Sequence, residues 1–300
     1  MTGKKRRFLK IREIREKVGQ AIALLSPPDL DRKLDEALPA VNSAGFDPWG
    51  MHPETVKRAA RALAPLYHHY FRVETQGIEN VPPGKCLLIA NHGGQIPIDG
   101  LMVALAMVLE GKPPRIVRAM VERWVPMVPW ISSFFIRVGE IIGHPKNCRE
   151  LLNAGQAVLV FPEGTRGSGK IFKHRYKLQR FGTGFARLAL ETGAPVVPVA
   201  LIGTEEAYPG IYNLKPLAKL LGAPYFPITP FFPLLGPLGI LPVPTKITVR
   251  FGTPIQLEGS ADAPENEIQR QVDRVKASLQ KEIDEGLKLR GDAILTKAAK

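Results

Sequence analysis

The chain has 300 residues, and its 45% hydrophobic content is ordinary for a globular protein with a full core, as one large domain or two modest ones. Its two cysteines, Cys86 and Cys148, exclude a disulfide framework and a zinc site of the usual spacing, and they fit a reducing, cytosolic setting. The 41 Lys and Arg residues against 28 Asp and Glu give a net charge of +13, which predicts an anionic partner: a phosphate-bearing small molecule, anionic lipid headgroups or nucleic acid.

The first 25 residues predict a basic amphipathic helix. Lysine and arginine dominate its start, and its apolar residues recur every three or four positions: Phe8, Ile11, Ile14, Val18, Ile22 and Leu25. Acidic Glu13 and Glu16 interrupt the stretch, so no secretory signal is evident and the N-terminus is expected to stay on the protein. Such a helix either lies on an anionic membrane surface or packs its apolar stripe on the rest of the protein.

Two more helices are expected, over residues 29–44 and 54–70, so residues 1–70 are predicted to form a helical, basic, membrane-surface region. From residue 71 the pattern changes to alternating strands and helices. The expected strands are 71–75, 87–90, 115–119, 157–161, 195–202 and 247–251, and the expected helices are 99–109, 146–153 and 183–191. This alternation predicts an α/β fold, with a central mixed sheet flanked by helices, in residues 71–258.

A histidine stands where the second expected strand ends. The apolar run 87–90 stops at Asn91-His92, and the two glycines that follow allow a tight turn. Ligands of open α/β sheets bind at the carboxyl ends of the strands, so His92 is the candidate catalytic residue, with the carboxylate of Asp99 as a partner. Asp99 has an alternative role as the N-cap of the helix that follows it.

A second turn, Phe161-Pro162-Glu163-Gly164-Thr165-Arg166-Gly167, follows the strand expected at 157–161. Its proline and glycines build a rigid loop from which Arg166 can grip a phosphate through two parallel hydrogen bonds. The alternative is a solvated loop in which Glu163 and Arg166 pair with each other. Basic residues continue downstream and are expected to extend the positive surface: Lys170, Lys173, Arg175, Lys177 and Arg180.

Together the two turns resemble the motifs of the glycerolipid (lysophospholipid) acyltransferase family. That family has an Asn-His block with a downstream Asp, then a Phe-Pro-Glu-Gly-Thr-Arg block about seventy residues later, and a strand reading Val-Pro-Val. Here these are Asn91-His92 with Asp99, residues 161–166, and Val197-Pro198-Val199. The resemblance covers residues 71 to 255, and the Phe-Pro-Glu-Gly-Thr-Arg string is highly specific.

The resemblance implies transfer of an acyl group from a thioester, acyl-CoA or acyl carrier protein, to a glycerolipid hydroxyl. It implies that His92 is the general base and that Asp99 orients and stabilises its imidazolium. It also implies that Glu163, Gly164, Thr165 and Arg166 hold the acceptor's phosphate. Because a thioester already has a good leaving group, no metal and no cofactor are expected. Backbone N–H groups of the Gly93-Gly94 turn are a further hypothesis, as donors to the oxyanion.

Two departures from the family pattern stand out. Six residues separate His92 from Asp99, where the family has four, so their contact requires the Gly-Gly turn to bulge. The family also has an arginine just after a short apolar strand in its intermediate block. Here that place reads Gly139-Glu140-Ile141-Ile142, and only Lys146 or Arg149 stands near enough to substitute.

Residues 225–245 carry no charge and are rich in Phe, Leu and Ile. Seven prolines between Pro224 and Pro244 exclude a continuous membrane-spanning helix. The segment either lines an acyl-chain groove or dips into a membrane interface, or it is an extended loop packed over the sheet. Residues 259–300 are expected to form a C-terminal amphipathic helix, over 264–289, and a tail.

The predicted protein is an O-acyltransferase that makes phosphatidic acid from 1-acylglycerol 3-phosphate, peripheral on the cytoplasmic face of a membrane. A different hydroxyl acceptor, a diacylglycerol or a long-chain alcohol, is the alternative reaction, and a lipid-binding pseudoenzyme is the alternative class. Nucleic acid is not expected as a partner, because no recognised nucleic-acid motif is present.

Overall fold

The computed structural model of the chain describes residues 13, 17, 19–93, 98–122, 131–220 and 225–298. Within these ranges the centre of the fold is a seven-stranded sheet with the order β1-β9-β6-β2-β5-β3-β4. Its strands are β1 (Glu74–Gln76), β2 (Cys86–Ala90), β3 (Val117–Val121), β4 (Ile141–Ile142), β5 (Ala157–Val160), β6 (Val196–Ile202) and β9 (Thr248–Phe251). Only the β6–β9 pair among them is antiparallel, so the sheet is mixed and the α/β prediction is confirmed.

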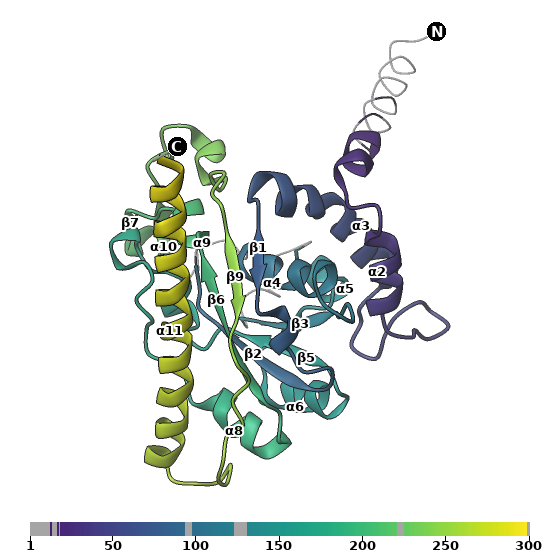
Figure 1. The fold of residues 1–300 in the computed structure, drawn as a ribbon, viewed down its shortest axis with the longest axis vertical. Helices are drawn as coiled ribbons and strands as arrows, with labels where there is room; N and C mark the ends of the chain where they lie inside the picture. The colour runs from purple at the N-terminus through teal and green to yellow at the C-terminus, as the bar shows by residue number, and fades with distance from the viewer. Residues whose placement is uncertain are drawn as a thin grey trace.

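The helices cover both faces of this sheet (Figure 1). They are α2 (Leu30–Ala37), α3 (Pro53–Pro65), α4 (Ile98–Leu109), α5 (Ile131–Arg137), α6 (Pro145–Asn153), α7 (Thr165–Ser168), α8 (Gly184–Thr192), α9 (Thr204–Ala207), α10 (Lys215–Leu220) and α11 (Glu265–Ala298). One core cluster joins α2, α3 and α4 to the sheet, and a second joins α6, α8 and α11 to the opposite face. Strand β2 serves both, since Leu88 belongs to the first and Leu87 to the second.

Strand β2 is the centre of the sheet and is buried along its whole length. It pairs in parallel with β5 on one side and with β6 on the other. A strand covered on both faces needs a continuous apolar sequence, and residues 86–90 provide one. Because the three strands run the same way, their carboxyl ends lie at one edge of the sheet, where the two predicted turns begin.

The N-terminal helices differ from expectation at their ends. The helix predicted over 29–44 stops at Ala37, because Leu38 precedes a proline and is extended. The helix predicted over 54–70 becomes a π-helix at Leu66–Tyr70. The strand predicted at 71–75 begins only at Glu74, because Arg72 has φ +46°, which a strand does not accommodate. The helix predicted for residues 1–25 lies mostly outside the described residues; residues 19–25 are helical.

The C-terminal helix is longer than predicted, and several small elements, α5 and β4 among them, were not predicted. Helix α11 extends to Ala298 and buries an apolar stripe against β6 and α8: Ile268, Val272, Val275, Leu279 and Ile283. Helix α5 and the two-residue strand β4 had no clear periodicity in the sequence, and β4 exists through its pairing with β3.

The uncharged segment 225–245 forms short local structure. Strand β8 (Pro227–Ile228) pairs with β7 (Tyr212–Asn213) in a separate two-stranded sheet, and a 3-10 helix, η5 (Gly236–Ile240), follows. In the described part of the chain, no helix is both long and apolar enough to cross a membrane.

A buried ion pair ties the loop before α3 to the sheet. The side chain of Arg118, in β3, is fully buried, and its Nη2 donates to Oδ2 of Asp47. The other Asp47 oxygen accepts from the backbone N–H groups of Met51 at 2.7 Å and Trp49 at 3.0 Å. The guanidinium also lies over the Trp49 ring, 5.7 Å from its centroid. The carboxylate therefore organises a loop and balances a buried charge at once.

Removing this carboxylate should be costly. In Asp47→Ala the guanidinium of Arg118 stays buried without its counter-charge, and we expect the free energy of unfolding to fall by about 3–5 kcal/mol. Urea unfolding followed by circular dichroism measures the change. The double variant Asp47→Leu/Arg118→Met removes both charges and should recover much of the loss. A single variant as stable as the wild type would contradict the assigned role of the pair.

Candidate active site

The Asn-His motif begins where β2 ends, at the carboxyl edge of the sheet. The buried side chain of Asn91 continues the ladder between β2 and β6: its Nδ2 donates to the carbonyl of Leu201 at 3.0 Å, and its Oδ1 accepts from the Leu201 N–H at 2.8 Å. An amide supplies the donor and the acceptor that these two backbone groups need. Asn91 thereby sets the position from which His92 leaves the strand.

His92 is held from three sides. Its Nδ1 lies 2.6 Å from Oδ2 of Asp99, and its ring stacks on Phe161 with centroids 4.2 Å apart and planes at 14°. Its backbone N–H donates to Oε1 of Glu163 at 3.0 Å. With Nδ1–H directed to a carboxylate, the neutral ring has its lone pair on Nε2, the arrangement of a general base.

Asp99 contacts His92, whereas its alternative role as an N-cap is not met, because α4 already begins at Ile98 and Asp99 lies inside the helix. It is 2% exposed and lies in the first turn of α4. Its Oδ1 accepts from the N–H of Gly100 at 2.8 Å, and its Oδ2 accepts from the His92 ring and, at 3.3 Å, from the N–H of Gly93. The Gly93 N–H, proposed as an oxyanion donor, is therefore directed to Asp99, and Gly94 lies outside the described residues.

Two glycines allow the loops to close on His92. A Cβ added at Gly167 would lie 2.8 Å from Cβ of His92 and 2.6 Å from Cβ of Glu163. A Cβ added at Gly93 would lie 1.6 Å from Oγ1 of Thr204, which follows β6. No side chain fits at either position, so the turns after β2, β5 and β6 form one packed unit.

Within the Phe-Pro-Glu-Gly-Thr-Arg loop, Glu163 is buried, whereas Thr165 and Arg166 are exposed. The Glu163 side chain is buried, and its carboxylate accepts from the backbone N–H groups of His92 and, at 2.8 Å, Gln179. This carboxylate joins two loops rather than facing a ligand or pairing with Arg166. Gly164 has φ +55°, and the side chains of Thr165 and Arg166 are exposed on α7.

Of the four auxiliary basic residues, three are exposed and one is buried. Lys173, Arg175 and Lys177 lie on the surface, with the Arg175 guanidinium over the Phe172 ring at 4.4 Å. Lys170 does not belong to this surface, because its side chain is only 6% exposed. Its Nζ lies 2.7 Å from Oε1 of Glu205 and 3.6 Å from Oε2 of Glu163, so burial of two carboxylates draws it inward.

The second carboxylate of this network links the site to more distant elements. Glu205, in α9, also accepts from the backbone N–H of Tyr176. Burial raises the pKa of Glu205, and the Lys170 ammonium opposes that shift. Sequence reasoning missed this partner of Lys170, because Glu205 is distant in sequence and belongs to no recognised motif.

Glu140 is another residue of the site region that sequence reasoning did not assign. It stands where the related family has its intermediate arginine, beside β4. Burial raises its pKa to about 8, and the negative charge of Asp99 adds to the shift. Glu122 lies close to the second turn, with its Oε1 3.2 Å from the position of a Cβ added at Gly164. Two carboxyl groups are therefore found in this part of the structure, and the buried Arg118 is also close, with its Nη1 3.1 Å from the position of a Cβ added at Gly139.

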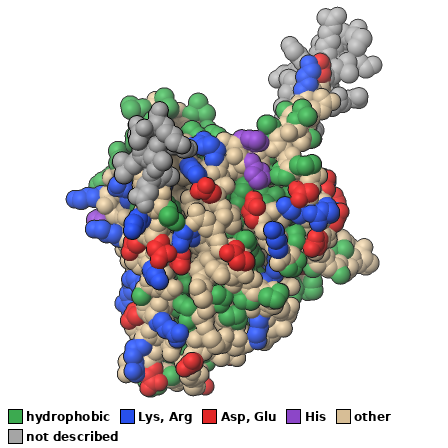
Figure 2. Space-filling view, in the orientation of Figure 1, with side chains coloured by type: hydrophobic (Ala, Val, Ile, Leu, Met, Phe, Trp, Pro, Cys, Tyr) green, Lys and Arg blue, Asp and Glu red, His purple; other side chains and the backbone are tan. Residues whose placement is uncertain are grey.

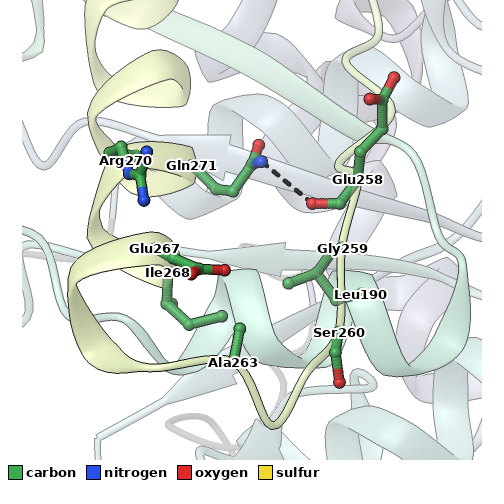
Figure 3. Close-up of a pocket in the computed structure, with 9 residues that line it drawn as sticks. All are labelled: Leu190, Glu258, Gly259, Ser260, Ala263, Glu267, Ile268, Arg270 and Gln271. Carbon is green, nitrogen blue, oxygen red and sulfur yellow. Dashed lines mark hydrogen bonds between the residues drawn. The ribbon is translucent and has the colours of Figure 1, made fainter.

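A shallow pocket lies elsewhere on the molecule (Figure 3). It is formed by α8, the start of α11 and the segment before it, near the lower end of the view in Figure 1. Gln271 crosses it and donates to the carbonyl of Glu258 at 3.0 Å. None of the predicted site residues lines it: the lining residues are Leu190, Glu258, Gly259, Ser260, Ala263, Glu267, Ile268, Arg270 and Gln271.

The raised pKa of Glu140 predicts a pH dependence of stability. Between the ordinary pKa of 4.5 and about 8, the folded state holds a proton that the unfolded state has lost. The free energy of unfolding should therefore fall as pH rises through this window, by at most about 1.4 kcal/mol per pH unit from this group.

Glu140→Gln removes the titrating group. Relative to the wild type, this variant should gain stability between pH 5 and pH 8, as measured by urea unfolding at both values. Glu258→Gln, at an exposed glutamate, is the matched control and should show no such trend. A difference between Glu140→Gln and wild type that does not change with pH would contradict the raised pKa.

Residues 72–202 match the family model described as Acyltransferase. An uncharacterized protein of Mycobacterium tuberculosis is 43% identical over 218 residues, which cover 72% of this chain and 60% of that protein. The chain therefore spans less than two thirds of the length of this relative.

Relatives whose names state an activity are more distant. The chloroplastic 1-acyl-sn-glycerol-3-phosphate acyltransferase of Brassica napus is 27% identical over 170 residues, covering 52% of this chain and 46% of that one. The mouse protein named DGAT1/2-independent enzyme synthesizing storage lipids is 26% identical over 235 residues, covering 75% and 66%. The solved structure of the 1-acyl-sn-glycerophosphate acyltransferase PlsC from Thermotoga maritima has a TM-score of 0.48 and 21% identity, covering 77% and 78%.

The matched residues include both turns that meet at His92 and the strands that position them. In residues 72–202, this chain therefore belongs to the glycerolipid acyltransferase family.

Proposed function

We propose that the chain transfers a fatty acyl group from a thioester to the hydroxyl of 1-acylglycerol 3-phosphate, with His92 as the general base. The contact between Nδ1 of His92 and Oδ2 of Asp99, at 2.6 Å, carries this proposal, because it fixes the ring with Nε2 as the proton acceptor. The family membership of residues 72–202 supports the reaction class.

In the proposed reaction, Nε2 of His92 takes the proton of the acceptor hydroxyl while its oxygen attacks the thioester carbonyl carbon. The tetrahedral intermediate then expels the thiolate, which receives the proton from the imidazolium. The carboxylate of Asp99 stabilises the imidazolium between these two transfers. Thiolate is a good leaving group, so the chemistry is complete with the acyl-CoA or acyl carrier protein donor and requires no cofactor.

Binding of the acceptor's phosphate is assigned to the exposed residues of the second turn. Arg166 offers two parallel N–H donors on α7, with the Thr165 hydroxyl beside it. Lys173, Arg175 and Lys177 add positive charge nearby. In this proposal Glu163 positions the loop, and the ammonium of Lys170 compensates the negative charge of the Glu163 carboxylate.

A neutral hydroxyl acceptor, a diacylglycerol or a long-chain alcohol, is the second candidate. The observation that favours it is the exposed carboxylate of Glu122 beside the second turn, because a negative charge there would weaken the binding of a phosphate. The name of the mouse relative, which refers to storage lipids, agrees with such an acceptor. For either acceptor, we propose a protein peripheral on the cytoplasmic face of a membrane, because both substrates carry long acyl chains.

Loss of the base should abolish most of the activity. In His92→Ala we expect kcat for acyl transfer from a long-chain acyl-CoA to lysophosphatidic acid in mixed micelles to fall about 10²- to 10⁴-fold. Asp99→Asn should fall less, because the ring keeps its stacking on Phe161. His174→Ala, at an exposed histidine, is the matched control and should retain activity. Unchanged transfer in His92→Ala would overturn the mechanism.

The Arg166 side chain separates the two acceptor classes. If the acceptor is phosphorylated, Arg166→Ala should raise KM for lysophosphatidic acid roughly tenfold or more and leave KM for the thioester nearly unchanged. Arg274→Ala, on the exposed side of α11, controls for the loss of one positive charge. Equal effects on both substrates, or faster wild-type transfer to diacylglycerol or a fatty alcohol, would favour the neutral acceptor.

A further inference from the structure

The segment 231–241, here called the apolar loop, exposes an unusual amount of hydrocarbon. Its exposed residues are Phe231 at 40%, Leu234 at 84%, Leu235 at 58%, Leu238 at 69% and Leu241 at 61%. Isolated exposed leucines are common on soluble proteins, but a group of them in one loop marks an interaction site. Hydrophobic side chains gather at the top of the space-filling view (Figure 2), at the end of the molecule where this loop lies in Figure 1.

The stretch of chain that contains the apolar loop has no acidic residue between 207 and 257, and its basic residues are Lys215, Lys219, Lys246 and Arg250. Lys246 pairs with Glu74, and Arg250 pairs with Glu282 and Glu285, so these two do not add free positive charge. The segment 172–177, which carries exposed basic residues, is linked to the uncharged segment 225–245 through residues 210 and 211. The N–H of Phe172 donates to the carbonyl of Gly210 at 2.7 Å, and the N–H of Ile211 donates to the carbonyl of Ile228 at 2.8 Å. An apolar tip with a basic border matches an anionic bilayer.

A second apolar element lies on the same side. Leu24 and Leu25, 85% and 47% exposed, end the helical residues 19–25. The carbonyl of Leu25 lies 3.1 Å from Nε2 of His69, and the next residue, Tyr70, donates its hydroxyl to the carbonyl of Pro242 at 2.6 Å. Adjacent residues of the π-helix thus hold this helix and the end of the apolar loop, and both extend toward the top of Figure 1.

The apolar loop also borders the edge of the sheet that carries His92. The N–H of Val243 donates to the carbonyl of Ala207 at 2.7 Å, and α9, which ends at Ala207, begins at Thr204, the residue in contact with Gly93. At the start of the uncharged segment 225–245, the ring of Tyr225 lies beside the second turn, because its Cδ1 is 3.6 Å from the position of a Cβ added at Gly169. A membrane at the apolar loop would therefore face the candidate active site.

We propose that the apolar loop inserts into the boundary between headgroups and acyl chains of an anionic lipid bilayer, with Lys173, Arg175 and Lys177 against the headgroups. This inference rests on the proposed function for the identity of the lipid substrate. It adds to that function the surface through which the substrate reaches His92. A bilayer fits better than a second copy of the chain, because two copies, each with a net charge of +13, would bring their basic borders together.

Site-specific labelling reads the insertion directly. Both native cysteines, Cys86 and Cys148, are buried, so Leu238→Cys adds an accessible thiol for an environment-sensitive fluorophore. The label should shift to shorter wavelength on vesicles made of equal parts phosphatidylcholine and phosphatidylglycerol, and a nitroxide buried in the acyl chains should quench it. Val41→Cys, at an exposed residue in the loop after α2, is the control and should show neither effect.

Vesicle cosedimentation tests the energetic contribution. Leu234→Glu/Leu238→Glu should weaken binding to the same vesicles roughly tenfold or more, whereas Val41→Glu, which adds one charge elsewhere, should change it little. Binding of the double variant equal to wild type would overturn the proposal. A wild-type dimer that the double variant dissolves, seen by sedimentation equilibrium without vesicles, would also overturn it in favour of a second copy.

These readouts need no turnover, so they are separable from the proposed reaction. If the double variant loses vesicle binding and still transfers acyl groups in detergent micelles, the insertion surface and the chemistry are both supported. If wild type inserts but transfers to no acceptor, the proposed reaction fails while the insertion surface stands.

Discussion

The carboxylate of Glu163 is the interaction on which the rest of the site depends. It accepts one N–H from His92, after β2, and one from Gln179, after the second turn, so that two loops from neighbouring strands share a single buried anion. Such a carboxylate is stable only when its hydrogen bonds and charge are satisfied, and Lys170 supplies the remaining cation. Mobility of either loop would break this network, and the His92 ring is therefore preorganised.

The same device recurs through the fold. Asp47 accepts hydrogen bonds from two backbone N–H groups and pairs with Arg118. Asp99 accepts from two backbone N–H groups and contacts His92. Glu205 accepts from the backbone N–H of Tyr176 and pairs with Lys170. In a chain of net charge +13, these four acidic residues, Glu163 included, are thus used inside, where each stabilises a loop by accepting hydrogen bonds from its amide groups. Much of the excess positive charge remains for the surface, around the second turn and the uncharged segment.

This division gives the molecule one functional side. Parallel strands end together, so the His92–Asp99 pair and the exposed end of the second turn lie at the carboxyl edge of the sheet, and Val243, at the end of the segment 225–245, is hydrogen-bonded there to Ala207. Helix α11 and the second core cluster stabilise the opposite face of the sheet without taking part in the site. An edge that is basic and partly apolar suits the proposed lipid substrate, which would stay partly in a membrane.

The sequence by itself determined the α/β class, most of the strands of the central sheet and the pairing of His92 with Asp99 as a hypothesis, because these depend on local apolar runs and on specific motifs. It did not determine the roles of Glu163 and Lys170 within their motif, since both appeared as ligand-binding residues until the fold surrounded them with His92, Gln179 and Glu205. Tertiary structure alone likewise determined the burial of Glu140 and the position of the apolar loop beside the edge of the sheet. The physical reason is that burial and partnership of a charge depend on residues far apart in sequence, whereas periodicity and turn chemistry are carried by neighbours.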